Sequence, residues 1–168
     1  MLSALTDAEK AAVLDALVAD DARIRAVAED VARLRLAHVD ARRVAHAVLE
    51  VLVGLSQEEL AAHAGRTRYG YVEPTEAAWA LLEQAVEPWI EDIVRRARLG
   101  LSEAARELAL GVLDGLYRCV ERTGRDDLLL SWAPDFPGEA ADRVMRALDD
   151  AGLELSESEV ARVAPDWA

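Results

Sequence analysis

Apolar residues spaced three and four positions apart are the feature that most constrains how this chain folds. The longest such run covers residues 75–99, and its apolar members are Ala78, Leu81, Leu82, Ala85, Val86, Trp89, Ile90, Ile93, Val94 and Ala97. This spacing places them on one stripe of a helix, whereas a half-buried strand alternates with a period of two. We find no convincing strand by that criterion, so the sequence predicts an all-α fold.

Capping signals predict where the helices begin and end. Three sequences have the spacing of a capping box: Thr6–Glu9, Ser56–Glu59 and Ser156–Glu159. Five glycines are placed to end helices: Gly54, Gly65, Gly100, Gly124 and Gly152. These signals predict about eight helices: residues 7–18, 22–36, a third after Asp40, 57–64, 75–99, 102–122, a seventh with Pro137 in its first turn, and 157–163.

The expected organisation is one helical domain that covers residues 1–168, with two subdomains, 1–65 and 73–168, as the alternative. In the alternative, residues 66–74 form the loop between the subdomains. Only a short turn at Gly100 separates the two longest helices, so we expect them to form an antiparallel central hairpin. The apolar stretch 125–136 is expected to pack onto the body.

Charge and composition exclude several function classes. The 168 residues carry 32 acidic and 19 basic side chains, a net charge of −13. Such a surface repels phosphate backbones and anionic lipids, so we expect no nucleic acid and no membrane as partner. Cys119 is the single cysteine, and the N-terminus lacks the features of a signal peptide. Both favour a cytoplasmic location.

Residue types that often carry catalysis or metals are present without a selective pattern. His46 and Glu50 lie four residues apart, but a catalytic zinc site usually needs three protein ligands. Cys119 is expected near a helix C-terminus, where nothing activates a thiol. Glu83, Glu87 and Glu91 share the polar face of one helix, opposite its apolar stripe. Because the glutamates of an iron site in a helix bundle point inward, we expect these three to face solvent instead. We predict no catalytic residue, no metal and no cofactor, and we lean against an enzyme.

Two other groups of residues are candidates for binding. Gly111 and Gly115 line one face of a helix, which indicates either close approach of another helix or room for a ligand near Tyr117. The loop from Arg66 to Tyr71 concentrates arginine and tyrosine, residues that favour interface hot spots. The candidate ligand- or partner-binding residues are Arg66, Arg68, Tyr69, Tyr71 and Tyr117.

Three sequence segments carry a resemblance to known proteins: residues 70–79 (GYVEPTEAAW), 115–119 (GLYRC) and 132–137 (WAPDFP). They resemble a family of uncharacterised helical proteins from GC-rich bacteria and are loosely similar to the helical regions that accompany SWIM-type zinc fingers. The finger itself needs several cysteines, and this chain has one. The resemblance therefore implies a helical fold and no activity.

The sequence favours a non-enzymatic helical module that binds a protein partner or associates with itself, for example as a homodimer. The alternative is a small-molecule sensor or an enzyme, with a pocket between helices around Gly111, Gly115 and Tyr117. A broad apolar patch on the folded protein favours the first, and a concave pocket with convergent polar groups favours the second.

Overall fold

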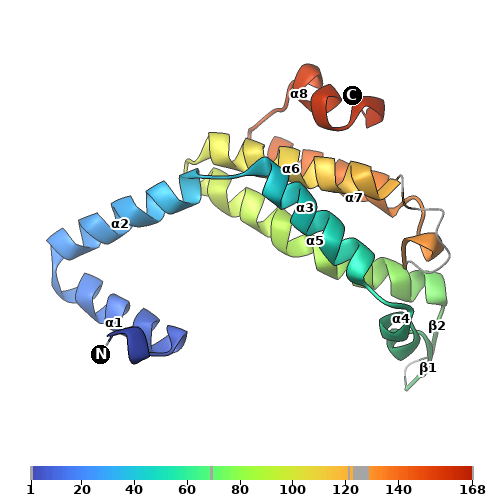
Figure 1. Ribbon diagram of the computed structural model, residues 1–168, viewed down its shortest axis with the longest axis horizontal. Coiled ribbons are helices and arrows are strands. Elements are labelled where there is room, and N and C mark those ends of the chain that lie inside the picture. The colour runs from blue at the N-terminus through green and yellow to red at the C-terminus, as the bar shows by residue number, and fades with distance from the viewer. Residues whose placement is uncertain (1, 69, 121, 123–128, 168) are drawn as a thin grey trace. The chain divides into compact units, whose positions relative to one another are not determined.

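The structure is a computed structural model that describes residues 2–68, 70–120, 122 and 129–167 (Figure 1). The described residues form eight α-helices, a two-stranded sheet and three short 3₁₀ helices, so the predicted all-α fold is confirmed. The α-helices are α1 (Asp7–Asp20), α2 (Ala22–Ala37), α3 (Ala41–Gly54), α4 (Gln57–His63), α5 (Pro74–Arg98), α6 (Ser102–Val120), α7 (Phe136–Asp150) and α8 (Glu157–Val163). The strands are β1 (Gly65–Thr67) and β2 (Gly70–Val72), and the 3₁₀ helices are η1 (Leu2–Ala4), η2 (Leu129–Trp132) and η3 (Pro165–Trp167).

The chain divides into two compact units, Met1–His38 and Val39–Ala168, which we call the first and the second unit. The first unit holds η1, α1 and α2, and the second unit holds all the other elements. The division falls directly before α3. The loop at 66–74, which the sequence suggested as an alternative boundary, lies inside the second unit.

The core of the second unit is built around α6. This helix contacts α3, α5, α7 and α8, and Figure 1 shows α3, α5 and α7 running alongside it. Leu108, Val112 and Leu116 of α6 are almost completely buried. The most extensive contact is with α3, a pairing of helices that the sequence pattern did not predict.

The central hairpin of α5 and α6 is present, and Gly100 makes its turn. Gly100 has a φ of +73°, a left-handed conformation that glycine adopts without steric cost. Its N–H donates to the carbonyl of Ala97 at 2.9 Å, and the N–H of Leu101 donates to that of Arg96 at 3.0 Å. This is the Schellman pattern expected at a helix end. Gly152 ends α7 with the same pattern, and Gly124 lies outside the described residues.

All three predicted capping boxes are present, at the starts of α1, α4 and α8. At the first, the hydroxyl of Thr6 accepts from the N–H of Glu9 at 3.3 Å, and the Glu9 carboxylate accepts from the N–H of Thr6 at 2.8 Å. The hydrogen bonds that this carboxylate accepts from the backbone and the hydroxyl of Thr6 favour its ionised form, so they lower the pKa of Glu9. The hydrogen bonds from Ser56 lower the pKa of Glu59 in the same way.

The prediction that the chain has no strand was wrong for residues 65–72. Antiparallel pairing of β1 with β2 places Gly65 opposite Val72, Arg66 opposite Tyr71 and Thr67 opposite Gly70. Each strand is only three residues long, so a period of two has no length over which to show. The positive φ of Gly65 (+99°) lets the chain leave the end of α4 and turn into β1.

The described part of the apolar stretch before α7, residues 129–136, packs onto the body as expected. Leu129, Leu130 and Phe136 are buried, while Trp132 is 42% exposed and Leu128 lies outside the described residues. The ring of Phe136 meets that of Trp79 edge-on, with centroids 5.3 Å apart. This contact connects the start of α7 with α5.

The helix α5 contains 25 residues, with Pro88 in its interior. An ion cluster joins Asp92 to Arg95 and Arg96 near the end of α5. Burial opposes ionisation of Asp92, but hydrogen bonds from Arg95 and Arg96 outweigh it and leave the pKa below its usual value. Neither α5 nor any other described helix is long and apolar enough to cross a membrane.

Candidate interaction surface

The first unit is a pair of helices whose connection is capped on both sides. Asp21 is the single residue between α1 and α2. Its carboxylate accepts hydrogen bonds from backbone amides in the first turn of α2, and the one from the N–H of Arg23 is 2.7 Å long. The guanidinium of Arg25 donates to the carbonyls of Val18 and Ala19, at 2.8 and 3.1 Å, at the end of α1. Local polar contacts therefore fix where one helix ends and the next begins.

No described residue of α1 or α2 is buried. The helix predicted for residues 22–36 forms as α2, but its large apolar side chains face solvent. Ile24 is 37% exposed, Val27 63%, Val31 52% and Leu34 72%. We call these four residues the α2 seam. A continuous apolar row of this kind on a folded protein usually marks a surface that contacts another molecule.

The apolar stripe of α3 is buried, unlike the α2 seam. Ala45, Val48, Leu49 and Leu52 form the equivalent stripe on α3, and all four are buried. They are buried because α3 packs along α6. Both helices carry an apolar stripe, and its large side chains are buried on α3 and exposed on α2.

A second apolar patch lies on α1. Val13, Leu14 and Leu17 are 39%, 50% and 47% exposed, respectively. Their spacing of three and four residues places them on one face of the helix. The first unit therefore presents seven large, exposed apolar side chains on two helices.

The charges of α2 differ from those of the whole chain. Four arginines and two acidic residues lie on this helix, although the complete sequence carries a net charge of −13. Asp30 precedes Val31 and Arg35 follows Leu34, so an acid and a base flank the α2 seam on opposite sides. The seam is thus an apolar row with a charge of each sign at its edges.

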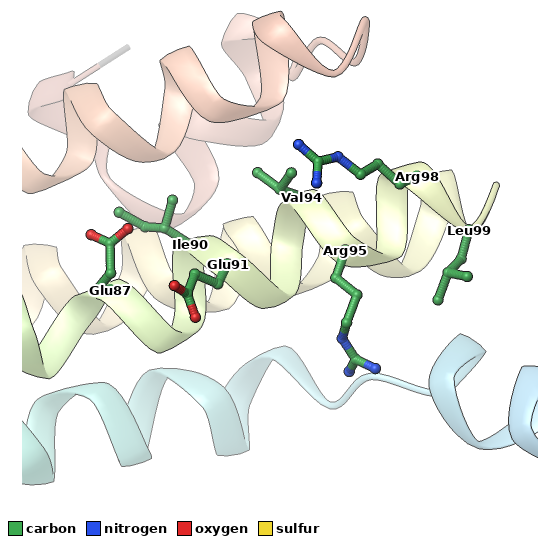
Figure 2. A pocket seen from close by; sticks show the side chains of 7 residues that line it. All are labelled: Glu87, Ile90, Glu91, Val94, Arg95, Arg98 and Leu99. Carbon is green, nitrogen blue, oxygen red and sulfur yellow. The ribbon is translucent and has the colours of Figure 1, made fainter.

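A shallow groove of about 490 Å³ follows the second half of α5 (Figure 2). Three apolar and four charged residues of α5 and its C-cap line the groove: Ile90, Val94, Leu99, Glu87, Glu91, Arg95 and Arg98. Figure 2 shows the guanidinium groups of Arg95 and Arg98 pointing away from each other. Because the charged groups do not converge on one point, this groove does not resemble a catalytic pocket.

Two of the three glutamates on the polar face of α5, Glu83 and Glu87, contact α7. Arg143 of α7 makes ion pairs with Glu83, at 3.4 Å, and with Glu87. All three side chains are partly exposed. Glu91 is exposed and lines the groove on α5. These contacts fit a solvated face that also ties α5 to α7.

The predicted binding residues of the loop lie on the β-hairpin. Arg66 and Tyr71 are directly opposite each other in the antiparallel register, so their side chains share one face of the ribbon. Tyr71 is 61% exposed, and Arg66 and Arg68 are exposed as well. Tyr69 lies outside the described residues. Arg66 and Tyr71 form a small exposed pair, and their role in binding stays a prediction.

Tyr117, the fifth predicted residue, contacts the C-terminal segment. Its hydroxyl donates to the carboxylate of Asp166 at 2.8 Å, and its ring meets that of Trp167 edge-on at 5.3 Å. Trp167 also lines a recess of about 220 Å³, together with residues of α6, α7 and α8. Asp142 is the single charged residue in that lining, so the recess lacks convergent polar groups.

Gly111 and Gly115 lie on α6 at its contact with α3. A Cβ atom on Gly111 would lie 2.7 Å from the carbonyl oxygen of Ala41, and one on Gly115 would lie 2.8 Å from that of Ala45. Distances this short show that only glycine allows the observed approach of the two helices. The sequence allowed either a helix or a ligand against this face of α6, and the structure places α3 there.

The histidine and cysteine candidates have ordinary structural surroundings. His46 lies 3.2 Å from Glu50, with both side chains about two-thirds exposed. The thiol of Cys119 donates to the carbonyl of Gly115 at 3.3 Å, and burial raises the pKa of this thiol to about 12. Within the described part of the chain, no three His, Cys, Asp or Glu side chains are grouped so that they could hold a metal ion.

The sequence does not reveal that the apolar side chains of α2 are exposed. Helix α3 is the more apolar and the more amphipathic of the two helices, and its burial also depends on contacts far away in the chain. Glycines on α6 create a cradle for α3, and no comparable pair of glycines occurs in the first unit, where the sequence has no glycine at all.

No protein-family model matches the chain, and comparisons with curated proteins and with solved structures gave no match either. The resemblance to helical proteins of GC-rich bacteria and to regions beside SWIM-type fingers therefore stays a prediction. What this chain does has to be inferred from its own residues, and the exposed apolar faces of the first unit are the feature that most needs an explanation.

Proposed function

We propose that this chain is a protein-interaction module that docks to its partner through the first unit. The second unit is the folded body, and α1 and α2 present the contact surface. The observation that carries this proposal is that the seven large apolar side chains of α1 and α2 are exposed. A cytoplasmic location and a protein partner, not a nucleic acid, belong to the same proposal, supported by the single buried cysteine and the net charge of −13.

Helix stability supports a partner for this unit. Isolated helices shorter than about 12–15 residues are marginal in water, because nucleation is costly and packing provides most of the stability. α1 has 14 residues and α2 has 16, and neither buries a side chain. Their caps define the ends of the helices but do not replace tertiary packing. A partner that covers the apolar faces would supply what is missing.

The exposed side chains offer enough free energy to matter. Complete burial of a Val, Leu or Ile side chain contributes about 1.5–3 kcal/mol. The seven side chains are on average about half exposed, so covering them contributes roughly 8 kcal/mol. Association costs on the order of 4–15 kcal/mol in lost freedom. Stable binding therefore requires that the partner also brings an apolar face.

Affinity capture from the cells that make this protein tests the proposal. The wild-type chain is compared with Val31→Asp, which places a charge in the α2 seam, and with Ala32→Asp, which places the same charge on an exposed position next to it. We expect a protein, either another chain or a second copy, to be retained by the wild type and by Ala32→Asp but lost from Val31→Asp. Mass spectrometry of the eluates reads proteins and small molecules together.

Two results would contradict the proposal. If Val31→Asp retained the same proteins as the wild type, the first unit would not be the docking surface. If the purified chain carried a stoichiometric small molecule and no protein, the alternative function as a sensor or an enzyme would replace it. Circular dichroism of both variants checks that the body stays folded.

A further inference from the structure

We propose that the partner of α2 is α2 of a second copy of this chain, and that the two helices pair as a parallel, two-stranded coiled coil. This inference rests on the function proposed above and names the partner. It is drawn from the spacing of the seam residues, from the shape of their side chains and from the charges beside them.

The α2 seam has the spacing of a heptad repeat. Ile24, Val27, Val31 and Leu34 follow one another at steps of three, four and three, so Ile24 and Val31 occupy a positions and Val27 and Leu34 occupy d positions. Both a positions hold β-branched residues, and one d position holds leucine. In parallel coiled coils, β-branched residues at a with leucine at d favour two strands.

The charges beside the seam are self-complementary in a parallel pair. In the register above, Asp30 is a g residue and Arg35 is the e residue of the following heptad. In a parallel dimer, each g residue lies next to the e residue of the following heptad on the other helix. Asp30 of each copy therefore lies beside Arg35 of the other, which gives one such pair on each side of the seam. The other flanking residues that meet are Arg23 and Ala28, so no like charges face each other.

The antiparallel arrangement lacks this complementarity. If the same four apolar layers were paired in opposite directions, Asp30 of one copy would lie beside Asp30 of the other. Like charges across a seam destabilise the pairing and suppress that orientation. The charges on α2 thus favour a particular orientation as well as a particular partner.

A second copy also fits better than an unrelated partner. A symmetric dimer requires a surface that is complementary to itself, which is true of an apolar row flanked by one acid and one base. Two heptads make a short coiled coil, and the exposed patch of Val13, Leu14 and Leu17 on α1 is available to enlarge the contact. We expect a dissociation constant of about micromolar order, since the seam has only four layers.

The oligomeric state of the purified full chain tests the pairing. Sedimentation equilibrium at concentrations from about one to several hundred micromolar is expected to show a species of twice the 18.3 kDa chain mass. Val31→Asp is expected to weaken dimerisation about a hundredfold or more, whereas Ala32→Asp leaves it unchanged. A wild-type chain that stays monomeric throughout this range overturns the inference.

Charge exchange tests the orientation. Asp30→Arg or Arg35→Asp alone is expected to weaken the dimer about tenfold, because each creates two like-charged contacts. The double variant Asp30→Arg/Arg35→Asp restores the attraction in a parallel dimer and not in an antiparallel one. A mixture of the two single variants is expected to form a heterodimer that is tighter than either homodimer.

Exchanging Glu29→Arg and Arg33→Asp is the matched control, because these residues lie outside the a, d, e and g positions. This exchange is expected to leave the dissociation constant unchanged. Failure of the double variant at positions 30 and 35 to restore dimerisation overturns the parallel pairing, even if the chain is a dimer.

The remaining outcomes separate this inference from the proposed function. A monomeric chain that binds a different protein through the α2 seam refutes pairing with itself and leaves the interaction module intact. A monomer whose α2 amides exchange slowly refutes both, since the seam would then be covered within one chain. Binding of vesicles of anionic phospholipid by a monomer, lost in Val31→Asp, also refutes both.

Discussion

At the residue scale, Gly111 and Gly115 decide how closely two helices meet. The absence of two side chains allows the backbone of α3 to lie directly on α6, and the carbonyls of Ala41 and Ala45 occupy the space of the missing methyl groups. Each glycine costs about 1 kcal/mol in helix propensity. The close packing of α3 on α6 offsets this cost, which explains why α6 carries two glycines in its middle.

Alanine at either of these glycines is therefore expected to destabilise the protein. The added methyl would meet backbone atoms and force α3 outward, with an expected loss of about 1–3 kcal/mol in the free energy of unfolding. Gly138→Ala on α7 is the control, since a Cβ there has no neighbour within 4 Å, and it is expected to stabilise by up to about 1 kcal/mol. Urea unfolding of the three variants measures the difference, and equal effects would contradict the packing.

Glu159 is expected to make stability depend on pH in acid. Hydrogen bonds from the side chain and the backbone of Ser156, together with one from Arg106, lower its pKa from 4.5 to about 2. A carboxylate with a depressed folded pKa stabilises the protein above its unfolded pKa, and this stabilisation is lost as the pH falls towards the folded value. Part of the stability is therefore expected to disappear between pH 4.5 and pH 2.

The variant Glu159→Gln tests this dependence. It is expected to be less stable than the wild type at neutral pH and to show a smaller decrease in unfolding free energy on acidification. Glu157→Gln, which removes a carboxylate from the same turn of α8, is the control. If the unfolding free energy of Glu159→Gln decreased as steeply in acid as that of the wild type, Ser156 and Arg106 would not stabilise the ionised form of this carboxylate.

At the element scale, the sequence predicted the helices well because their signals are local. Thr6, Ser56 and Ser156 begin their helices as the capping-box spacing predicted, and Gly100 and Gly152 end theirs. The β-hairpin was missed since its strands are too short for periodicity. The pairing of α3 with α6 was missed because it depends on contacts between residues far apart in the chain.

The candidate surface was only half predictable for a related reason. Periodicity identifies an apolar stripe but does not say what covers it, and the stripe of α3 is covered because two glycines let α3 pack on α6. The arginines and tyrosines of the loop were expected to be the contact surface from their residue types alone. The structure places Arg66 and Tyr71 together on a small ribbon, whereas Tyr117 is engaged with Asp166.

Replacement of the cap of α2 is expected to weaken that helix. Asp21→Ala removes the carboxylate that accepts from the first-turn amides, and the expected cost is about 1 kcal/mol in helix stability. Asp20→Ala is the neighbouring control, because Asp20 is the last residue of α1 and does not cap α2. Loss of helical signals from residues 22–37 in the first variant only, measured by NMR chemical shifts, would confirm the role of Asp21.

At the scale of the whole molecule, the two units differ in how they are stabilised. The second unit has a core around α6, whereas no described residue of α1 or α2 is fully buried. Hydrogen bonds in the first unit are therefore expected to open with much smaller free energies than those in the second. The two units should behave as separate cooperative elements.

Amide hydrogen exchange at several protein concentrations is expected to show this difference. In dilute solution, amides of α1 and α2 should exchange rapidly, while those of α6 stay protected. At higher concentration, pairing through the α2 seam should slow exchange in α2 and leave α6 unaffected. Protection of α2 that does not depend on concentration would contradict association as its source.

The two units also differ in their spectroscopic signals. All four tryptophans, Trp79, Trp89, Trp132 and Trp167, lie in the second unit, and residues 1–38 contain no tryptophan, tyrosine or phenylalanine. Intrinsic fluorescence therefore follows the body alone, while far-ultraviolet circular dichroism records the helices of both units. Without any added dye, a comparison of the two signals during heating distinguishes melting of the α1–α2 pair from melting of the rest.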